Sequence, residues 1–383
     1  MANSPATAQN PAPQKSVPAI PFPLASRKMS RFSFTTGAVT AQPGASVPIS
    51  PIQIPAVGYL SHIDLEVTVT TSGATSATTV LADGPFSIIQ SLEFRTAAGN
   101  DIIVPLTGYQ MYLANKYGAQ FCPAPYSDAK LDPTYANTSG ASAGAHFFLP
   151  IPLSIDAGTG YGAIPALASN RSYQAVITLA PLSSVYGTAV PTNATVTINA
   201  VAYYWSEPPA NTATNVPQAT APSGIGSVSQ WQIEQPAVTP GDKLIKSNNV
   251  GNVIRTLIFT LRTAAGARTD TDFPAVSELY LDNEPMFYFG KTEWKSLMGK
   301  WFGLTNTTLD AAGGLDTGVF VIPFYALTGS LAGDVSNSRS QLLPTVDASQ
   351  LQIRGTSFGA NSSTLEIVTN SVIPRDAATL YAR

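Results

Sequence analysis

The chain has 383 residues, of which 44% are hydrophobic and only 11% are charged, and its formal net charge is −3. This length exceeds one compact core and predicts two domains of about 150–200 residues, while the near-neutral charge excludes a global basic field for nucleic acid. The single cysteine, Cys122, excludes an internal disulfide and a cysteine-based zinc site.

Residues 1–34 are predicted to be a mobile N-terminal arm, because the first 24 positions are rich in Pro, Ala, Gln and Asn. The opening MANSPATAQNPAPQK lacks the apolar core of a signal peptide, and no run of about 20 apolar residues follows it anywhere. We therefore expect a chain that is made and kept in a cytoplasm until it assembles.

The predicted arm ends in a small basic cluster, formed by Arg27, Lys28 and Arg31 beside Phe32. A basic segment with aromatic neighbours can dock on anionic lipid head groups, at about 1 kcal/mol per charge. It could equally contact packaged nucleic acid or a neighbouring subunit, or be ordinary surface charge beside the first strand. These four residues are the candidate membrane- or neighbour-contacting site.

Residues 35–206 are predicted to form a first β-sandwich with one short helix. Apolar and polar residues alternate in short runs rich in Val, Ile, Thr, Phe and Tyr, which Gly, Pro, Ser or Asn bound. A helix is expected over 107–118, with Thr107 as N-cap and Gly118 after its end. No charged residue lies between Ser172 and Ser206, so this surface suits contact with copies of itself. The strand-like runs are 59–71, 86–95, 145–155, 172–182 and 194–205.

Residues 207–228 carry four prolines and few large apolar side chains, and are predicted to be a linker. Residues 229–383 then return to strand-like runs and form the second predicted sandwich. A helix is expected over 292–303, with Thr292 as N-cap. Its apolar residues Trp294, Leu297, Met298 and Trp301 fall on one face. The strand-like runs are 253–262, 276–281, 318–327, 350–356 and 363–373.

The two halves repeat one order of elements. The two helices recur at an offset of 185, and the strands after them align Pro150 with Pro323 at an offset of 173. The pentapeptide RTAAG occurs at 95–99 and again at 262–266. Its offset of 167 matches neither the offset of the helices nor that of the strands after them. We interpret both copies as strand-to-turn exits that share letters by chance. The repeat predicts an all-β fold of two similar sandwiches in tandem.

Three patterns could carry chemistry, and each has a more ordinary explanation. The stretch GTSFG (355–359) matches a nucleophile elbow at Ser357, but no helix pattern and no His follow it. The only histidines, His62 and His146, lie at strand starts without metal-ligand spacing and are expected to be structural. Asp270 and Asp272 could ligate calcium, although a solvated loop is the favoured interpretation. We therefore predict no catalytic residue, no metal site and no cofactor.

The order of elements in 84–118, repeated in 276–303, resembles the major capsid protein of tectivirus-like, tailless, membrane-containing phages, the double jelly-roll lineage. The resemblance covers most of residues 35–380 as a pattern of elements. It implies two tandem eight-stranded jelly rolls, each with one short helix, in a structural protein that is not an enzyme. Its pseudo-hexagonal homotrimers would tile an icosahedral shell over an internal lipid membrane.

The resemblance also implies partners and a location. The partners would be the chain itself, first in a homotrimer and then in neighbouring trimers, together with minor capsid and vertex proteins. The internal viral membrane would meet the N-terminal arm, and no sequence-specific nucleic-acid binding is expected. The chain would belong to the virion shell and would lie in the host cytoplasm before assembly.

An alternative function stays open at this point. A secreted carbohydrate-binding or glycan-cleaving double β-sandwich would share the strand pattern. It would require a groove lined by exposed aromatic residues, or by carboxylates or a metal, together with a signal peptide and a monomeric state.

Overall fold

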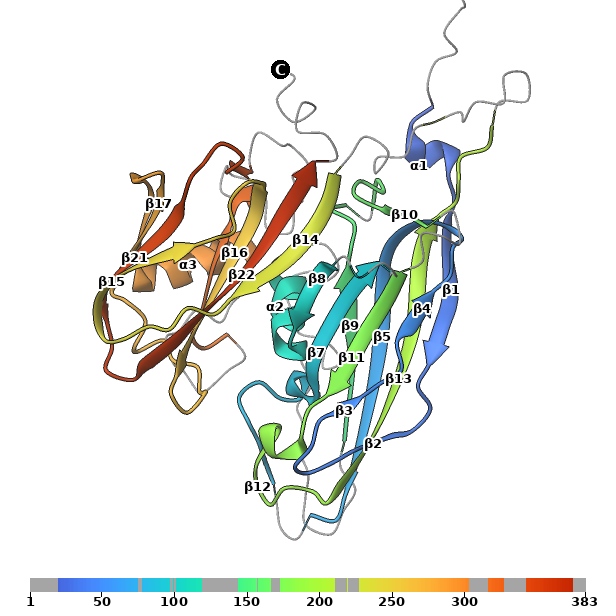
Figure 1. Ribbon diagram of the computed structural model, residues 1–383, viewed down its shortest axis with the longest axis horizontal. Helices are drawn as coiled ribbons and strands as arrows, with labels where there is room; N and C mark the ends of the chain where they lie inside the picture. The colour runs from blue at the N-terminus through green and yellow to red at the C-terminus, as the bar shows by residue number, and fades with distance from the viewer. Residues whose placement is uncertain are drawn as a thin grey trace, which may run out of the picture.

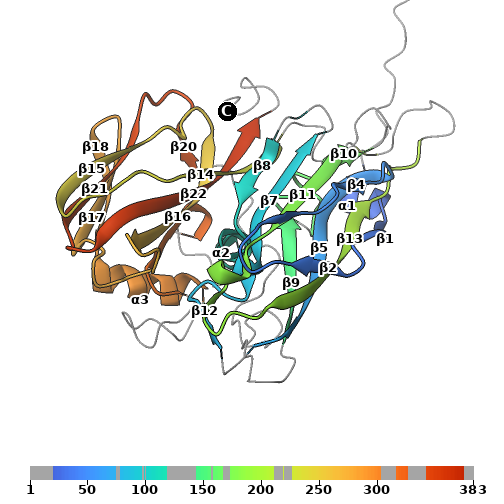
Figure 2. The ribbon, with the colours of Figure 1, turned by 60° about the horizontal axis from the view of Figure 1, so that its bottom comes forward.

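The computed structural model describes residues 20–74, 78–96, 99, 101–118, 144–156, 158–166, 173–210, 219, 227–302, 316–326 and 342–374. These residues form two β-sandwich units side by side, with one helix, α2, between them (Figures 1 and 2). The all-β architecture predicted from the alternating patterns is confirmed.

The first unit consists of two facing sheets. One sheet has the order β1-β13-β5-β10, with β2 paired to β13 and β9 to β5. The strands β8-β7-β11-β3 form the opposite layer, with β4 also paired to β11. The elements are α1 (Phe22–Ala25), β1 (Lys28–Thr35), β2 (Val39–Ala41), β3 (Val47–Pro48), β4 (Ile52–Ile54), β5 (Gly58–Ser72), β6 (Thr79–Val80), β7 (Ile89–Thr96), β8 (Asp101–Leu106), α2 (Gly108–Gly118), β9 (Gly144–Pro152), β10 (Ile164–Ala166), β11 (Tyr173–Leu179), β12 (Tyr186–Thr188) and β13 (Asn193–Trp205).

The second unit has the same two layers. The strands β14-β22-β16-β19 form one layer, with β20 paired to β16, and β15-β21-β17-β18 form the other. The elements are β14 (Ser227–Glu234), β15 (Gly241–Ser247), β16 (Val253–Thr263), β17 (Val276–Leu281), β18 (Glu284–Gly290), α3 (Lys291–Phe302), β19 (Val319–Pro323), β20 (Leu343–Pro344), β21 (Leu351–Phe358) and β22 (Ser362–Pro374).

Both units have jelly-roll topology. With the short strands β3 and β4 taken together as the second strand, one sheet of each unit joins the first, eighth, third and sixth principal strands. The other sheet joins the second, seventh, fourth and fifth. The helix follows the fifth strand in both units, as α2 follows β8 and α3 follows β18. Two tandem eight-stranded jelly rolls, each with one short helix after its fifth strand, are therefore confirmed.

A β-bulge recurs at the same place in both units. In the first unit Leu60 pairs with Tyr204 and His62 with Tyr203, which leaves Ser61 as the extra residue. The second unit has the same irregularity between β16 and β22, where the extra residue is Arg255. A bulge inserts one unpaired residue and bends its strand. The shared bulge therefore fixes the structural alignment of the two units independently of sequence identity.

This alignment corrects one detail of the predicted repeat. In the first unit Pro152 pairs with His62, and in the second Pro323 pairs with Thr256, which occupies the position of His62. Pro152 is therefore the equivalent of Pro323, and the alignment of Pro150 with Pro323 is wrong by two residues. Because side chains alternate with a period of two, the slip leaves every residue on its predicted face.

Both predicted helices are present, but only the first has the predicted cap. The Oγ1 of Thr107 accepts a hydrogen bond from the backbone N–H of Gln110 at 3.1 Å, and the Gln110 side chain accepts the N–H of Thr107 at 2.9 Å, which forms a capping box. Helix α3 begins at Lys291, so Thr292 lies inside the helix and is not the cap. Trp294 and Met298 are buried, as their spacing predicts.

The structure also moves two predicted segment boundaries. Residues 22–25 form α1 and residues 28–35 form β1, so the last part of the predicted arm, 1–34, is a paired strand. Residues 1–19 lie outside the described residues, as does most of the predicted linker 207–228. Strand β14 already begins at residue 227.

Both RTAAG copies end strands, as predicted. Thr96 closes β7 and accepts the N–H of Gly99, and Thr263 closes β16 and accepts the N–H of Gly266. The repeated pentapeptide therefore marks two similar turns that belong to non-equivalent strands.

Candidate assembly surfaces

The two units are joined edge to edge. Strand β8 of the first unit pairs in parallel with β14 of the second, with Ile103 opposite Trp231, and this pairing makes one ten-stranded sheet (Figure 1). Most of the buried apolar residues also form one contiguous cluster that includes both sandwiches. The junction therefore has the character of a domain interior rather than of a hinge.

Helix α2 lies at the centre of this junction (Figure 2). Every residue from Gly108 to Gly118 is buried, since the helix packs on β7 and β9 of its own unit and on β16, β19 and β22 of the other. The carbonyl groups of a last helical turn have no partner within the helix. Here the second unit supplies the donors. Arg255 donates to the carbonyl of Gly118 at 3.0 Å, and the Tyr325 hydroxyl donates to the carbonyl of Tyr117 at 2.7 Å.

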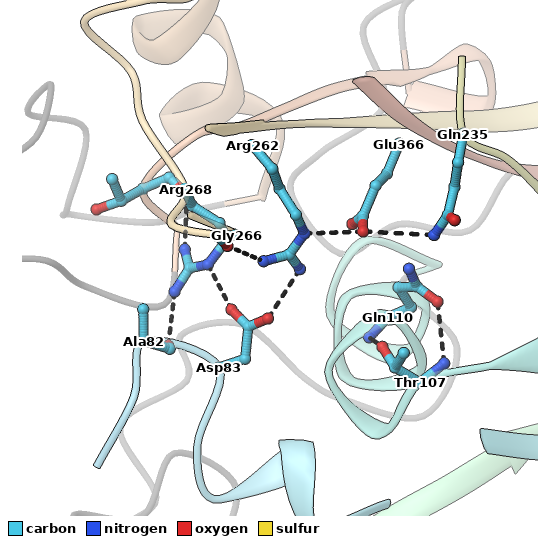
Figure 3. A network of polar contacts seen from close by, with 10 residues as sticks. Ala82, Asp83, Thr107, Gln110, Gln235, Arg262, Gly266, Arg268 and Glu366 are labelled. Atoms are coloured by element: carbon cyan, nitrogen blue, oxygen red, sulfur yellow. Dashed lines mark hydrogen bonds and ion pairs between the residues drawn. The ribbon is translucent and has the colours of Figure 1, made fainter. Parts of the chain in front are cut away.

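A polar network, the Asp83 clamp, closes the junction on one side of α2 (Figure 3). The Asp83 carboxylate of the first unit accepts from Arg268 at 2.7 Å and pairs with Arg262 at 2.8 Å, and Arg262 also pairs with Glu366 at 2.8 Å. Burial opposes the charge of Arg262, but the two carboxylates outweigh this effect and raise its pKa. The Arg268 guanidinium lies over the ring of Tyr109, 4.6 Å from its centroid.

A second ion network lies at the C-terminal end of α2. The Asp316 carboxylate accepts from Lys116 at 2.8 Å and from the Tyr117 hydroxyl at 2.6 Å, across the junction. Burial alone would raise the pKa of Asp316, but the Lys116 charge and these hydrogen bonds lower it. Loss of one partner of a buried ion pair leaves an uncompensated charge and is strongly destabilising, so the two units are expected to stay together as one body.

The outer face of the β1-β13-β5 sheet, by contrast, is open in the described part of the chain. A groove of about 300 Å³ lies on it. The rings of His62 and Tyr203 stack in parallel with centroids 4.5 Å apart, and the Lys28 Nζ lies 5.0 Å from the Trp205 ring centroid. The lining residues are Lys28, Met29, Ser30, Ser61, His62, Tyr203, Tyr204 and Trp205.

Of the four predicted contact residues, Lys28 lines this groove. Arg27, Lys28 and Arg31 are exposed at the start of β1, whose outer edge pairs with no strand among the described residues. The backbone of Phe32 pairs with Val201, and its side chain lies outside the described residues. The sequence pattern located the basic cluster but missed His62 and Tyr203 beside it, because strand pairing brings together residues 141 positions apart.

Burial shifts the pKa values of His62, which lines the groove, and of Asp64, which lies 4.0 Å from it. It lowers the pKa of His62 to about 4, with a further contribution from the Lys28 charge. It raises the pKa of Asp64 to about 6, against a hydrogen bond from Tyr203 that lowers it. His62 is therefore neutral near pH 7, and its 4.0 Å approach to Asp64 is not an ion pair at that pH.

The nucleophile-elbow pattern does not have the structural setting that it requires. Ser357 has a positive φ of 63° and lies near the end of β21, but the next element is strand β22 rather than a helix. Its backbone N–H donates to Asp242 at 2.8 Å. The predicted strand-edge turn agrees with this geometry.

The other two candidate pairs have structural partners. His146 contacts Glu66 at 2.8 Å on the outer face of β5 and β9, and Glu66 also accepts from Asn199. Asp270 and Asp272 are buried, so the expected solvated loop is wrong. Asp270 pairs with Lys295 at 2.9 Å and accepts the N–H of Gly318. Asp272 accepts from Asn361 at the turn before β22. Their carboxylates thus face different partners and do not converge on a cation.

The described residues hold no group of three or more His, Cys, Asp or Glu side chains placed to bind a metal ion. None of their helices has the length and hydropathy needed to cross a membrane.

No protein-family model matches the sequence, and no curated protein is similar to it in sequence. Solved structures, however, share its fold. The MCP of STIV, the Sulfolobus Turreted Icosahedral Virus, aligns over 93% of this chain and all of its own, with a TM-score of 0.64 and 13% identity.

Two more solved structures align over similar lengths. VP54 of PBCV-1, fitted into a reconstruction of the virophage Sputnik, aligns over 91% of this chain and 93% of its own, with a TM-score of 0.60 and 12% identity. The major capsid protein P2 of bacteriophage PM2 covers 91% of this chain and 99% of its own, with a TM-score of 0.52 and 13% identity. The chain therefore has the double jelly-roll fold of these capsid proteins over nearly its whole length.

Proposed function

We propose that this chain is the major capsid protein of an icosahedral virus of the double jelly-roll lineage. The observation that carries the proposal is the complete duplicated jelly roll, which matches capsid proteins over more than nine-tenths of both chains. The low charge content and the charge-free stretch between Ser172 and Ser206 support it, because neutral flanks can abut without like-charge repulsion.

The unit of assembly in this proposal is a homotrimer. Each chain supplies two units of similar topology, so three chains supply the six corners of a pseudo-hexagon. Such trimers would tile the shell and meet minor capsid and vertex proteins at its special positions. The chain would therefore belong to the virion, with a cytoplasmic pool in the host before assembly.

The finer proposal is that the shell covers an internal lipid membrane, as in tectivirus-like phages. Helix α1 and the described end of β22 lie at the same end of the molecule (Figure 1). The exposed Arg27 and Lys28 follow α1 directly. This end carries positive charge next to the residues that precede α1, so it is the end we propose to face anionic lipid.

The alternative of glycan binding or cleavage has weaker support. A sugar-binding groove requires an exposed aromatic face. In the groove described above, Trp205 is buried and the ring of Tyr203 is already stacked on His62. Asp270 and Asp272, the nearest approach to a carboxylate pair, are committed to Lys295 and Asn361.

The native mass tests the proposal. Sedimentation of the purified full chain is expected to give three times the chain mass of 40.0 kDa, unchanged on dilution because obligate interfaces are large. A stable monomer at micromolar concentration would contradict the trimer. Calorimetric binding of oligosaccharides by such a monomer would favour the alternative function.

A further inference from the structure

The two units meet head to tail, and the same contact surfaces occur a second time on the outside of the chain. Within one chain, the fifth strand of the first unit, β8, pairs with the first strand of the second unit, β14. The fifth strand of the second unit is β18 and the first strand of the first unit is β1. Each of these ends its sheet in the described part of the chain. A head-to-tail contact of this kind can be repeated until a ring closes.

The shared bulge identifies what covers the equivalent face in the second unit. It aligns Ser61 with Arg255, and the residues opposite β22 and β13 align Ser30 with Trp231. In the second unit these two positions are buried under α2, where Arg255 donates to Gly118. In the first unit the same two positions lie in the open groove.

Side-chain size follows the same division. Trp231 and Arg255 fill the junction inside the chain with two of its largest fully buried side chains. Ser30 and Ser61 leave the equivalent space on the outside empty, which accounts for the groove of about 300 Å³. A groove at this position therefore has the location of a helix-docking site and room for a helix that brings its own bulky residues.

Helix α3 and strand β18 carry such residues. Helix α2 is buried along its whole length, whereas in α3 Thr292, Ser296 and Lys300 are exposed and Trp301 is half-buried. On β18, Tyr288 is 63% exposed and Met286 is 43% exposed. Beyond Glu284 at its start, β18 carries no charge, and an exposed apolar edge of this kind is either an aggregation hazard or an interface.

The charges at the two outer edges are complementary. Glu284 is exposed at the start of β18, and Lys28 and Arg31 are exposed on β1. Opposite charges at the two edges favour the pairing of unlike edges over the pairing of two β18 edges.

We propose that β18 and α3 of one copy dock on β1 and on the groove around His62 and Tyr203 of the next copy, which repeats the β8–α2 to β14 junction between chains. This assignment rests on the proposed homotrimer and names the surfaces that build it. In it, three identical contacts between chains alternate with three junctions within chains. Lys28 and Arg31 on β1 then contact a neighbouring subunit, and Arg27, which precedes β1, remains on the end proposed to face lipid.

A cross-linking experiment tests the assignment directly. In a full-length Cys122→Ala background, Ser30→Cys is combined with Met286→Cys, and the native protein is oxidised. Covalent dimers and closed trimers are expected on a non-reducing gel. The matched control combines Ser30→Cys with Leu244→Cys, since Leu244 is 54% exposed, against 43% for Met286, but lies on β15, at the opposite edge of the β18 sheet. The control is expected to stay uncrosslinked.

Two substitutions test the same contact by size and charge. Ser30→Trp fills the groove with the side chain found at the equivalent position, and Tyr288→Arg places a charge on the apolar edge. Each is expected to raise the dissociation constant of the trimer at least tenfold, while the circular dichroism spectrum keeps its β signal. Ser30→Ala and Leu244→Arg are the controls and are expected to sediment as trimers.

The outcomes separate this inference from the proposed function. If the unmodified chain is a trimer but Ser30→Trp and Tyr288→Arg leave it intact and the cysteine pair does not cross-link, the surface assignment is wrong and the trimer stands. Cross-linking of the Leu244 pair in place of the Met286 pair would also overturn it. If the unmodified chain is a monomer, the proposed function itself is contradicted.

Discussion

The guanidinium of Arg268 donates to the carboxylate of Asp83 at 2.7 Å, although 185 residues separate them and each belongs to a different jelly roll. Arg268 is 1% exposed at its side chain, and it also donates to the carbonyls of Ala82 and Thr317. One side chain therefore holds a loop of the first unit and a loop of the second in a fixed relation.

Arg268→Ala is expected to lower the free energy of unfolding by about 3–5 kcal/mol, because it removes one of the two guanidinium partners of the Asp83 carboxylate and the donor of two carbonyls. Urea unfolding of the full chain at one protein concentration measures the change. The control is Arg354→Ala, since the Arg354 side chain is 48% exposed and its 3.4 Å pair with Glu278 is expected to contribute little to stability. Equal effects of the two variants would mean that the Asp83 clamp does not hold the units together.

Trp294→Ala is expected to destabilise the second unit by about 3–5 kcal/mol. The Trp294 ring is fully buried between Phe289 and Phe320, and its indole N–H donates to the carbonyl of Val321 at 2.8 Å. The loss therefore combines a cavity with an unpaired buried carbonyl. Leu244→Ala, at an exposed site, is the control. A melting curve for Trp294→Ala that coincides with the wild-type curve would contradict the packing of α3.

His62 is expected to make stability depend on pH in the acid range. Its pKa is about 4 in the folded state and ordinarily 6.5, so below pH 6.5 the unfolded chain takes up a proton that the folded chain does not. Stability is therefore lost as the pH falls from about 6.5 to 4, by at most about 3 kcal/mol. Relative to the wild type, His62→Gln is expected to gain stability over this window.

Asp64 is expected to change stability with pH in the opposite direction to His62, so Asp64→Asn serves as the matched variant. Its folded pKa of about 6 lies above its ordinary value of 3.8, so protonation favours the folded state as the pH falls from about 6 to 4. The stability advantage of Asp64→Asn over the wild type is therefore expected to shrink on acidification. Urea midpoints measured at several pH values compare the two variants, and parallel curves for both would contradict the burial of the groove.

Deletion of residues 1–19 is expected to leave the trimer and its melting temperature unchanged, while shell assembly or binding to anionic vesicles is weakened. Deletion of residues 1–31 is expected to destabilise the fold as well, because it removes half of β1 and the buried Phe22, whose ring lies 5.6 Å from that of Trp205. Sedimentation with phosphatidylserine vesicles measures lipid binding. Unchanged binding by the 1–19 deletion would contradict a role of residues 1–19 in attachment to lipid.

Local patterns predicted the elements and their repetition well. The capping box of Thr107, the i, i+3, i+4, i+7 face of Trp294 and the alternating strands are all set by residues close together in the sequence. Thr292 was wrongly predicted as the N-cap of the second helix. The hairpin strand β18 ends at Gly290, and the helix begins at the next residue, Lys291, whose N–H donates to the carbonyl of Ala275 across the sheet.

Contacts between distant segments could not be predicted in this way. Asp270 and Asp272 resemble a solvated pair in sequence, but Lys295 and Asn361, which satisfy them, come from other elements. At the junction, Arg255 donates to the last carbonyl of α2, but the residues around it in the sequence have the pattern of an ordinary strand and do not reveal this role. Only the fold brings it to the end of α2, and a bulge aims it there.

The sheet that runs from β19 to β3 without interruption has a mechanical consequence. Two units that share a hydrogen-bonded sheet, a buried α-helix and buried ion pairs are not free to bend at the junction between them. In the proposed shell, curvature would then arise only at the contacts between neighbouring molecules. Each molecule would keep the same shape from the centre of a face to the vertex. Particle size would accordingly be set by whatever adjusts the angle at those contacts, and not by the capsid protein itself.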